Sequence, residues 1–117
     1  MATINDGATG TFLANLAVSA FRGVVLSSNG GVTYSGATGV IDGFTVEDAA
    51  SGDYVAVRFF NASGTQKCEI TAQPVTVADT LYLGALGRVS TTGTVVCGKA
   101  LTTSATNGQV IEFYPTY

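Results

Sequence analysis

Hydrophobic and β-branched residues in this chain stand in short runs that are separated by glycine, asparagine and serine. Short apolar runs between turn residues are typical of β-strands, and the spacing of a long amphipathic helix is absent. The strongest turn is Asn29-Gly30, which separates Val24-Val25-Leu26 from Val32-Thr33-Tyr34. A tight hairpin turn needs positive φ angles, which Asn and Gly tolerate. Further turns are expected at 61–64 and 84–87, so the pattern predicts an all-β fold.

The hydrophobic pattern occurs twice. The stretch VVLSSNGGVTYSGA at 24–37 returns as LYLGALGRVSTTGT at 81–94, at a constant offset of 57 positions. Four pairs of identical residues align at this offset: Leu26 with Leu83, Gly30 with Gly87, Val32 with Val89, and Gly36 with Gly93. Strand and turn residues make up the shared pattern, which indicates that the repeated segment serves packing and not chemistry.

The alignment continues when two residues of slippage are allowed. The further aligned segments are 40–43 with 95–98, Val46 with Leu101, the loop at 49–52 with the loop at 104–108, and Val55 with Ile111. In the last strands Val57 aligns with Phe113, 56 positions apart. Ala56 aligns with Glu112 on the opposite face, so the repeat preserves the alternation of inward and outward positions.

The two repeated units, residues 24–57 and 81–113, are each too small to bury a face alone. We therefore expect them to pack into a single β domain at 12–117, a small sandwich or barrel built from two related β units. The segment 66–79 is expected to link the units, since its Pro74 fits an edge or a connection better than a central strand. Residues 1–11 contain small polar residues and two glycines, and we expect a flexible N-terminal arm there.

The composition limits the classes of partner. Hydrophobic residues make up 46% of the 117 residues, which indicates a folded core, and only 11% are charged, against about 25% in an ordinary soluble domain. A surface with so few charges is either covered by other protein or is the Thr-rich exterior of a β-sheet. The net charge is −3, and the five basic residues do not cluster. Phosphate binding requires a basic patch, so nucleic acid is not an expected partner.

Cys68 and Cys97 are too few to build a disulfide-dependent scaffold. Each lies in an apolar, strand-like setting, so we expect two buried thiols, with a disulfide between them as the open alternative. The apolar run FLANLAVSAF at 12–21 is not preceded by Lys or Arg and does not fit a secretion signal. No stretch approaches the ~20 apolar residues of a membrane span. The expectation is a soluble protein that is made and kept in the cytoplasm.

The sequence offers little for catalysis. It has no histidine, which excludes Ser–His and Cys–His pairs, and no phosphate-binding glycine motif follows a strand. The carboxylates of Asp42, Glu47, Asp48 and Asp53 fall within one stretch, DGFTVEDAASGD. Their spacing does not match an EF-hand loop, and solvated loop charges are the simpler interpretation, with calcium as the open alternative. We therefore expect no enzyme, no cofactor and no metal site.

The order of strand and turn residues carries a resemblance to a known family. AASGD at 49–53 enters the strand of Val55 and Val57, and the second series reads ADTLYL, GRV, VCGKA and QVIEF between 78 and 113. This order resembles the capsid decoration, or cement, proteins of tailed bacteriophages, in particular the small group once described as RecA/RadA-associated phage proteins. The resemblance covers 23–114. Ala78-Asp79 replaces the Gly-Asp of that pattern, and FLANLAVSAF replaces its polar extended start.

The resemblance implies a structural virion protein. Such a protein binds the outer surface of the expanded phage head in many copies and stabilises it against internal DNA pressure. The implied partners are the major capsid protein and neighbouring copies, with a trimer as a common arrangement. The implied location is the capsid exterior, after synthesis in the host cytoplasm. Contacts with the capsid or a neighbour are expected from the arm and the aromatic C-terminus: Thr3, Ile4, Asn5, Tyr114 and Tyr117.

A second class of function is a virion-associated binding module, part of a head fibre or tail, that recognises a carbohydrate or a cell-surface ligand. Sugar platforms usually present exposed aromatics, often Trp, which this chain lacks. Tyr34, Tyr54 and Tyr82 are the residues that would replace it, although strand positions near turns explain them equally well. A glycan array separates the two classes, because a cement protein is expected to bind no specific glycan.

Overall fold

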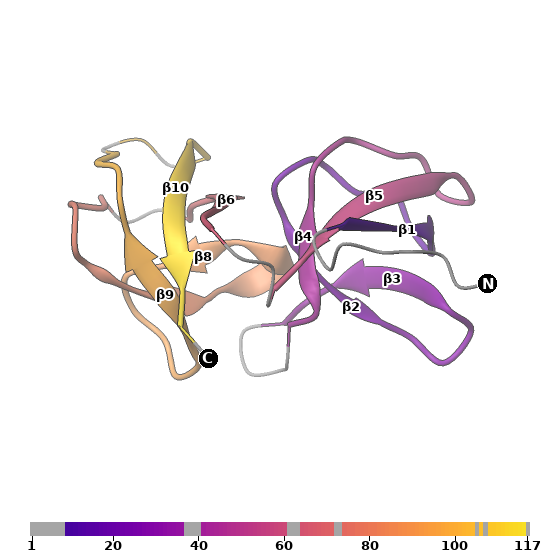
Figure 1. Cartoon of the computed structure of the whole chain (residues 1–117), viewed down its shortest axis with the longest axis horizontal. Helices are drawn as coiled ribbons and strands as arrows, with labels where there is room; N and C mark the ends of the chain where they lie inside the picture. Colours follow the sequence, from indigo (N-terminus) through magenta and orange to yellow (C-terminus); the bar gives the residue numbers. More distant parts are fainter. Residues whose placement is uncertain are drawn as a thin grey trace.

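The computed structural model describes residues 9–36, 41–60, 64–71, 74–104, 106 and 108–116. These residues form ten β-strands and one short 3-10 helix, and none of their helical structure is long and apolar enough to cross a membrane. The prediction of an all-β fold is confirmed. The strands make two units that lie side by side along the longest axis of the molecule, which measures 42 × 26 × 22 Å (Figure 1).

The first unit is a closed barrel. Its strands pair in the order β1-β3-β2-β4-β5, and β5 pairs with β1 to close it. β2 and β3 form the hairpin predicted around Asn29-Gly30, in which Leu26 lies opposite Val32 and Gly30 has a φ of 85°. The strands are β1 (Thr9–Ala14), β2 (Gly23–Leu26), β3 (Gly31–Tyr34), β4 (Gly43–Thr45) and β5 (Tyr54–Phe59).

The second unit is a curled sheet with the same connectivity. Its strands pair in the order β6-β10-β9-β7-β8, so each strand has the neighbours of its counterpart in the first unit. Among the described residues, one parallel bridge, between Ile70 and Val89, joins the β6 side to the β8 side. The counterpart strands of the first unit, β1 and β3, pair at two positions. The elements are β6 (Gln66–Glu69), β7 (Thr80–Leu83), η1 (Ala85–Gly87), β8 (Val89–Ser90), β9 (Val96–Ala100) and β10 (Val110–Pro115).

Equivalent backbone features recur in the two units. Phe21 and Ala78, 57 positions apart, are non-glycine residues that both have a positive φ, at 62° and 78°. Their backbone N–H groups donate to equivalent carbonyl oxygens, those of Thr45 and Ala100, each at 2.8 Å. Two isolated bridges are also equivalent: Val18 with Ala49, and Val75 with Ser104. The prediction that two related β units build the fold is therefore confirmed.

The predicted register of the last strand in each unit is also confirmed. Val57 in β5 and Phe113 in β10 are 2% and 0% exposed, and their neighbours Ala56 and Glu112 lie half-buried on the outer face. Alternation along these strands thus directs equivalent residues into the two cores.

The unit boundaries differ from the prediction in two places. The segment 66–79 was predicted to link the units, and the structure places its first part inside the second unit, because Gln66–Glu69 forms β6 and pairs with β10. β6 is the counterpart of β1, but TGTFLA and QKCE share no pattern that an alignment detects. The predicted arm extended to Thr11, whereas β1 begins at Thr9 and pairs there with Arg58 of β5. Residues 1–8 of the arm lie outside the described residues.

Each unit has its own apolar core, and Phe44 connects the two. The prediction that neither unit could bury a face alone is wrong for the first unit, because β1 closes its barrel. Phe44 lies in β4 of the first unit but packs in the core of the second, edge-on against Phe113, with ring centroids 5.4 Å apart. Ile41 and Phe60 of the first unit pack against the same core. Burying a phenylalanine side chain contributes about 1.5–3 kcal/mol, so the second unit gains part of its stability from the first.

Candidate contact surfaces

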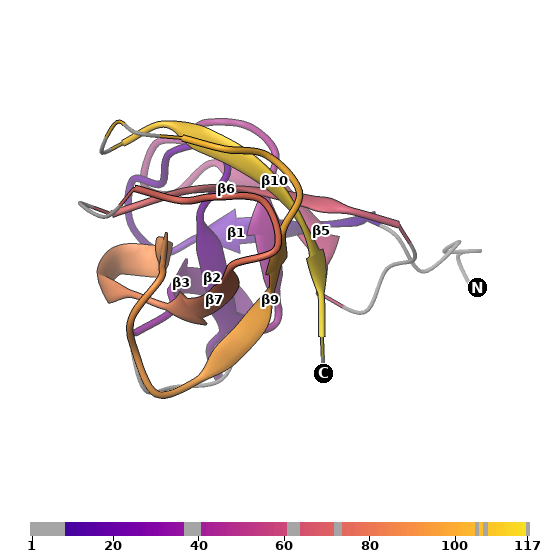
Figure 2. The same cartoon turned by 90° about the vertical axis from the view of Figure 1, so that its left-hand side faces the viewer.

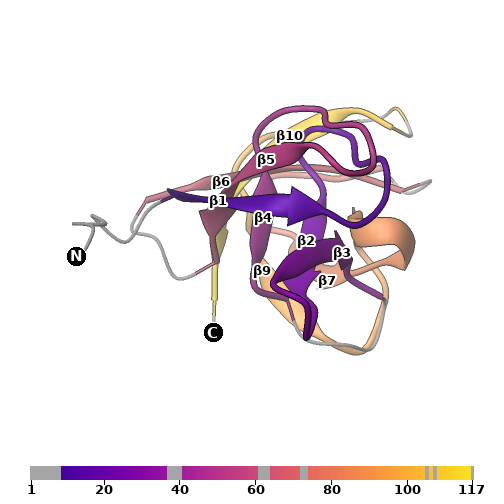
Figure 3. The same ribbon diagram turned by 90° about the vertical axis from the view of Figure 1, so that its right-hand side faces the viewer.

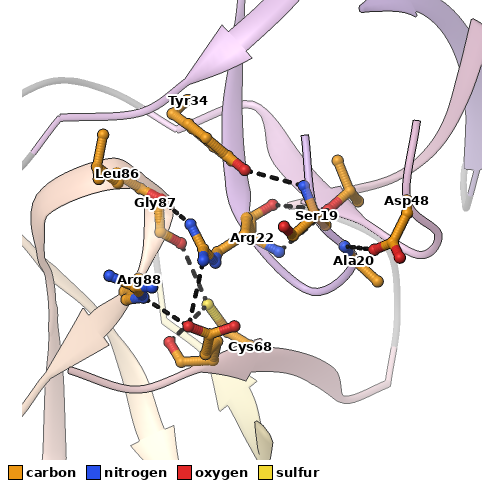
Figure 4. A network of polar contacts seen from close by, with 11 residues as sticks. Ser19, Ala20, Arg22, Tyr34, Asp48, Cys68, Leu86, Gly87 and Arg88 are labelled. Carbon is orange, nitrogen blue, oxygen red and sulfur yellow. Dashed lines mark hydrogen bonds and ion pairs between the residues drawn. The ribbon is translucent and has the colours of Figure 1, made fainter. Parts of the chain in front are cut away.

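Arg22 lies at the centre of the polar contacts between the units (Figure 4). Its Nη1 donates to the carbonyl oxygen of Leu86 at 3.1 Å, and its Nη2 lies 3.2 Å from Oε2 of Glu69. The same carboxylate oxygen accepts from Nε of Arg88 at 2.6 Å, and the ring of Tyr34 lies 5.2 Å from the Arg22 guanidinium. Arg22 is only 8% exposed, so these contacts form a closed joint between the units.

The backbones of the two units also meet directly at this joint. The N–H of Glu69 donates to the carbonyl oxygen of Phe21 at 2.8 Å, and the N–H of Gly87 donates to that of Ser35 at 2.9 Å. A Cβ atom on Gly87 would lie 2.3 Å from the carbonyl oxygen of Gly23, which is closer than atoms can approach. Glycine is therefore required at 87 for the units to pack this closely.

Tyr114 is the predicted contact residue that falls within the described part of the chain. It is 42% exposed on β10 and lies opposite the exposed Lys99 of β9. Further exposed apolar side chains lie on or next to these two strands. We name the β9–β10 surface by its five exposed residues: Val96, Lys99, Leu101, Val110 and Tyr114. Tyr114 is accessible to a partner, and its role as a contact stays a prediction.

Thr3, Ile4, Asn5 and Tyr117, the other predicted contact residues, lie outside the described residues. The strands that lead to them run to the same side of the molecule. The start of β1 and the end of β10 both lie on the right in Figure 2 and on the left in Figure 3. Along the longest axis the two strands lie in different units, β1 in the first and β10 in the second (Figure 1).

A pocket of about 320 Å³ opens into the first unit. Its lining is apolar except for one carboxylate: Phe12, Val24, Leu26, Val32, Ile41, Asp42, Val57, Phe59 and Phe60. Leu26 is 46% exposed there, and Phe12 meets Phe59 edge-on with ring centroids 5.9 Å apart. Oδ2 of Asp42 accepts the backbone N–H of Leu26 at 2.8 Å, which holds the carboxylate at the pocket. Sequence reasoning missed this pocket, because the apolar pattern does not tell a covered core position from an open one.

The acidic stretch DGFTVEDAASGD does not gather into a metal site. Three of its carboxylates accept backbone N–H groups: Asp42 from Leu26, Glu47 from Ala56, and Asp48 from Ala20. Among the described residues, no group of three or more His, Cys, Asp or Glu side chains lies close enough to hold a metal ion. The calcium alternative therefore gains no support, and three of these acids serve the local backbone.

Cys68 and Cys97 are free and buried, as predicted. Burial raises the pKa of Cys68 well above its ordinary value, and the neighbouring Cys97 raises it further. Burial also raises the pKa of Cys97 to about 12. Only the thiolate is a nucleophile, so both thiols are poorly suited to covalent chemistry at neutral pH.

Two of the three tyrosines considered for ligand binding take different roles. The hydroxyl of Tyr34 accepts the backbone N–H of Ser19 at 2.9 Å, and its ring contacts Arg22, so this side chain is part of the joint. Tyr54 is 70% exposed at the start of β5 and is free to meet a partner.

Comparison with known proteins gives one kind of match. No family model matches the sequence, and no curated protein matches it. Among solved structures, the chain is similar to the head fiber gp8.5 N base in bacteriophage phi29. The TM-score is 0.76 at 20% sequence identity, and the alignment covers 92% of each chain. At this identity the likeness establishes a shared fold over almost the whole chain, including both units.

Proposed function

We propose that this chain is a structural protein of a bacteriophage virion that binds the outer surface of the head in many copies and stabilises it. The observation that supports this most directly is the likeness to a phage head fiber base over 92% of both chains. The resemblance of the strand and turn residues to capsid decoration proteins supports the same class independently.

The surface of the chain agrees with a structural role. Only 11% of the residues are charged, and the β9–β10 surface exposes Val96, Leu101, Val110 and Tyr114 in addition to Lys99. Tyrosine is one of the residues that contribute most of the binding free energy at protein interfaces, and burial of the exposed aliphatic side chains beside Tyr114 would add to it. The buried thiols and the backbone-bound carboxylates are contacts of the fold, so we propose no enzymatic activity and no cofactor.

The proposed partner is the major capsid protein on the exterior of the expanded head. Thr3, Ile4 and Asn5 of the N-terminal segment, together with Tyr117, are proposed to contact it, and Tyr114 to contact the capsid or a neighbouring copy. Many weak contacts of this kind act together when a shell presents the same site repeatedly. Binding to the expanded shell alone stabilises that shell by linkage.

A second candidate is the base of a head fibre that carries a ligand-binding module. The head fiber base among the similar structures favours it. The two candidates share attachment to the head, and they differ in whether the virion uses the protein to strengthen the shell or to recognise a carbohydrate or cell-surface ligand.

Co-sedimentation of the full chain with empty shells of its source phage, before and after expansion, tests the proposal. We expect saturable binding to expanded shells and a rise in the temperature at which those shells break. Binding without any gain in shell stability, together with a specific hit on a glycan array, would favour the fibre base. Absence of binding to either form of shell would overturn both candidates.

Two matched variants locate the contact. A chain that lacks residues 1–8 keeps all of β1, and we expect it to fold as the parent does but to bind shells more weakly. Tyr114→Ser is compared with Tyr54→Ser, since both side chains are exposed and lie in counterpart strands. A loss of shell binding with Tyr114→Ser alone assigns the contact to the β10 side. Equal binding by both variants and by the shortened chain would contradict the proposed contact residues.

A further inference from the structure

The pocket of the first unit has a counterpart in the second unit, and there it is filled. Six of the lining residues have equivalents in the second core: Phe12 and Cys68, Val24 and Leu81, Leu26 and Leu83, Val32 and Val89, Asp42 and Cys97, Val57 and Phe113. Each of these six equivalents is at most 1% exposed. The first unit covers them, because Phe44 belongs to that core and Ile41 and Phe60 pack against it.

The exposed fractions of Leu26 and Leu83 show how the two pockets differ. They are the same residue at equivalent positions of the same hairpin, yet Leu26 is 46% exposed and Leu83 is 1% exposed. Leu83 lies in the core that Phe44 completes, whereas Leu26 lines an open cavity of about 320 Å³. The first unit therefore has an apolar pocket that is open to solvent. Side chains of the first unit fill the equivalent pocket of the second unit.

The second unit has a surface equivalent to the one from which β4 of the first unit inserts Phe44. The alignment that places Gly43 on Gly98 places Phe44 on Lys99 and Ile41 on Val96. Lys99 is exposed and Val96 is 48% exposed. Tyr114, the counterpart of Arg58, stands beside Lys99. The β9–β10 surface thus repeats, on the second unit, the position from which β4 inserts Phe44.

The two positions that face each other in this packing differ in charge between the units. Inside the chain, an aromatic ring at Phe44 shares a core with the buried thiol of Cys97. At the free counterparts, Lys99 replaces the ring and Asp42 replaces the thiol. The apolar stem of a lysine can pass over apolar side chains such as Leu26 while its ammonium group reaches a carboxylate. The exposed Lys99 of the β9–β10 surface and Asp42 of the open pocket are therefore complementary in charge.

We infer that a second copy of this chain covers the pocket: its β9–β10 surface lies over Leu26, and its Lys99 enters the pocket to pair with Asp42. The contact repeats between chains the packing that joins the two units within one chain. It is heterologous, since the surface and the pocket belong to different units, and such contacts form closed rings or open chains. The inference concerns the free protein and does not depend on binding to a phage head.

Sedimentation velocity of the full chain over a wide concentration series tests the inference. We expect self-association that weakens at high salt, because a partly exposed ion pair is screened. Lys99→Glu should weaken it by about tenfold or more, since the new carboxylate would face Asp42. Lys67→Glu is the matched control, because Lys67 is an exposed lysine of β6 that lies opposite Glu112, with β10 between it and Lys99, and its reversal changes the net charge equally. We expect that control to associate as the parent does.

A reversed pair sharpens the test. Asp42→Lys in the Lys99→Glu background restores the attraction with opposite signs and should restore association. Asp42→Lys also removes the acceptor for the N–H of Leu26, so its thermal unfolding is measured in parallel. If that chain fails to fold, Asp42→Asn keeps an acceptor oxygen, removes the charge and should weaken association of the parent.

Three results would overturn the inference. The first is a parent chain that stays monomeric at its highest soluble concentration. The second is an equal loss of association in Lys99→Glu and Lys67→Glu, or no loss in Asp42→Asn. The third is an apolar fluorescent probe that binds the pocket equally well when the chain is monomeric and when it is associated, because a second copy over the pocket should exclude the probe.

Discussion

The two units of this protein have the same strand connectivity but are completed in different ways. In the first unit, β1 pairs with β5 at five positions and with β3 at two, so its own strands close the barrel. In the second unit, β6 meets the β8 side through the bridge of Ile70 with Val89, and Phe44 of the first unit completes the core. A repeated sequence pattern can therefore specify the same strand order in two units without specifying how each unit is closed.

The two units therefore differ in whether their core depends on side chains from the other unit. The second core contains a side chain from the first unit, whereas the core residues of the first unit, Val24, Val32, Val55 and Val57 among them, come from that unit alone. Elements whose buried contacts come from a neighbour lose stability when that neighbour is altered. Substitutions at equivalent positions of the two units should thus have unequal effects.

Phe44→Ala should give the largest effect. The side chain is 1% exposed, and removing a buried phenylalanine costs about 3–5 kcal/mol of unfolding free energy. Its counterpart substitution, Lys99→Ala, removes an exposed side chain and should change the unfolding free energy by about 0.5 kcal/mol or less. Urea unfolding of the monomeric chain at low concentration measures both. Similar costs at the two positions would mean that Phe44 does not complete the second core.

Gly87→Ala against Gly30→Ala tests the backbone contact between the units. Both glycines have a positive φ, 76° and 85°, so alanine costs about 1–2 kcal/mol at either position. A Cβ at 30 meets nothing within 4 Å, whereas a Cβ at 87 would lie 2.3 Å from the backbone of Gly23. We expect the thermal midpoint of Gly87→Ala to fall further, by the additional ~1–3 kcal/mol of overpacking. Equal midpoints would indicate that the two units can move apart at Gly87 without a loss of unfolding free energy.

Arg22→Met tests the ion pairs of the joint. The Arg22 side chain is 10% exposed and that of Arg88 is 33% exposed, although both contact the same oxygen of Glu69. A hydrogen bond to a charged group contributes about 1.5–3 kcal/mol when it is buried, and exposed ion pairs contribute less than about 1 kcal/mol. Arg22→Met should therefore cost about 2 kcal/mol in urea unfolding, and Arg88→Met clearly less. The reverse order would place the important contact on the solvent side of Glu69.

Much of this architecture could be predicted from the sequence, because turn and strand residues report local backbone geometry. The hairpin at Asn29-Gly30, the inward positions Val57 and Phe113, and the existence of two units all follow from such local signals. The strand-like setting of Cys68 was predicted, but the place of β6 in the second unit was not, because QKCE shares no pattern with β1 and its place is specified by pairing with β10. A pairing of that kind depends on residues far away in the chain.

The contact surfaces could be predicted only in part. Tyr114 was predicted as a contact residue from its place near an aromatic C-terminus, and the structure shows that it is 42% exposed and lies opposite Lys99. The open pocket was not predictable, since Leu26 and Leu83 are identical in sequence and differ only in what covers them. The repeat itself was the available signal: comparing Phe44 with Lys99, and Cys97 with Asp42, shows which covered positions have uncovered counterparts.

The pH dependence of Cys97 gives the smallest expected effect and reports on the cover supplied by Phe44. Burial raises the pKa of Cys97 from 9.0 to about 12, so above about pH 9 the unfolded chain releases a thiol proton that the folded chain keeps. The unfolded state then binds fewer protons, and the unfolding free energy falls as the pH rises from about 9 toward 12. Near pH 9.5 the loss from this thiol is about 1 kcal/mol relative to neutral pH.

Cys97→Ala removes this term while it leaves Cys68 and the other alkaline groups in place. Urea unfolding near pH 7 and near pH 9.5 should therefore show a steeper loss for the parent than for Cys97→Ala. An equal loss would mean that Cys97 ionises in the folded protein, and hence that solvent reaches the core beneath Phe44. In that case the pocket of the second unit would be as open as the pocket that contains Asp42. The two units would then not differ in whether a neighbour covers their core.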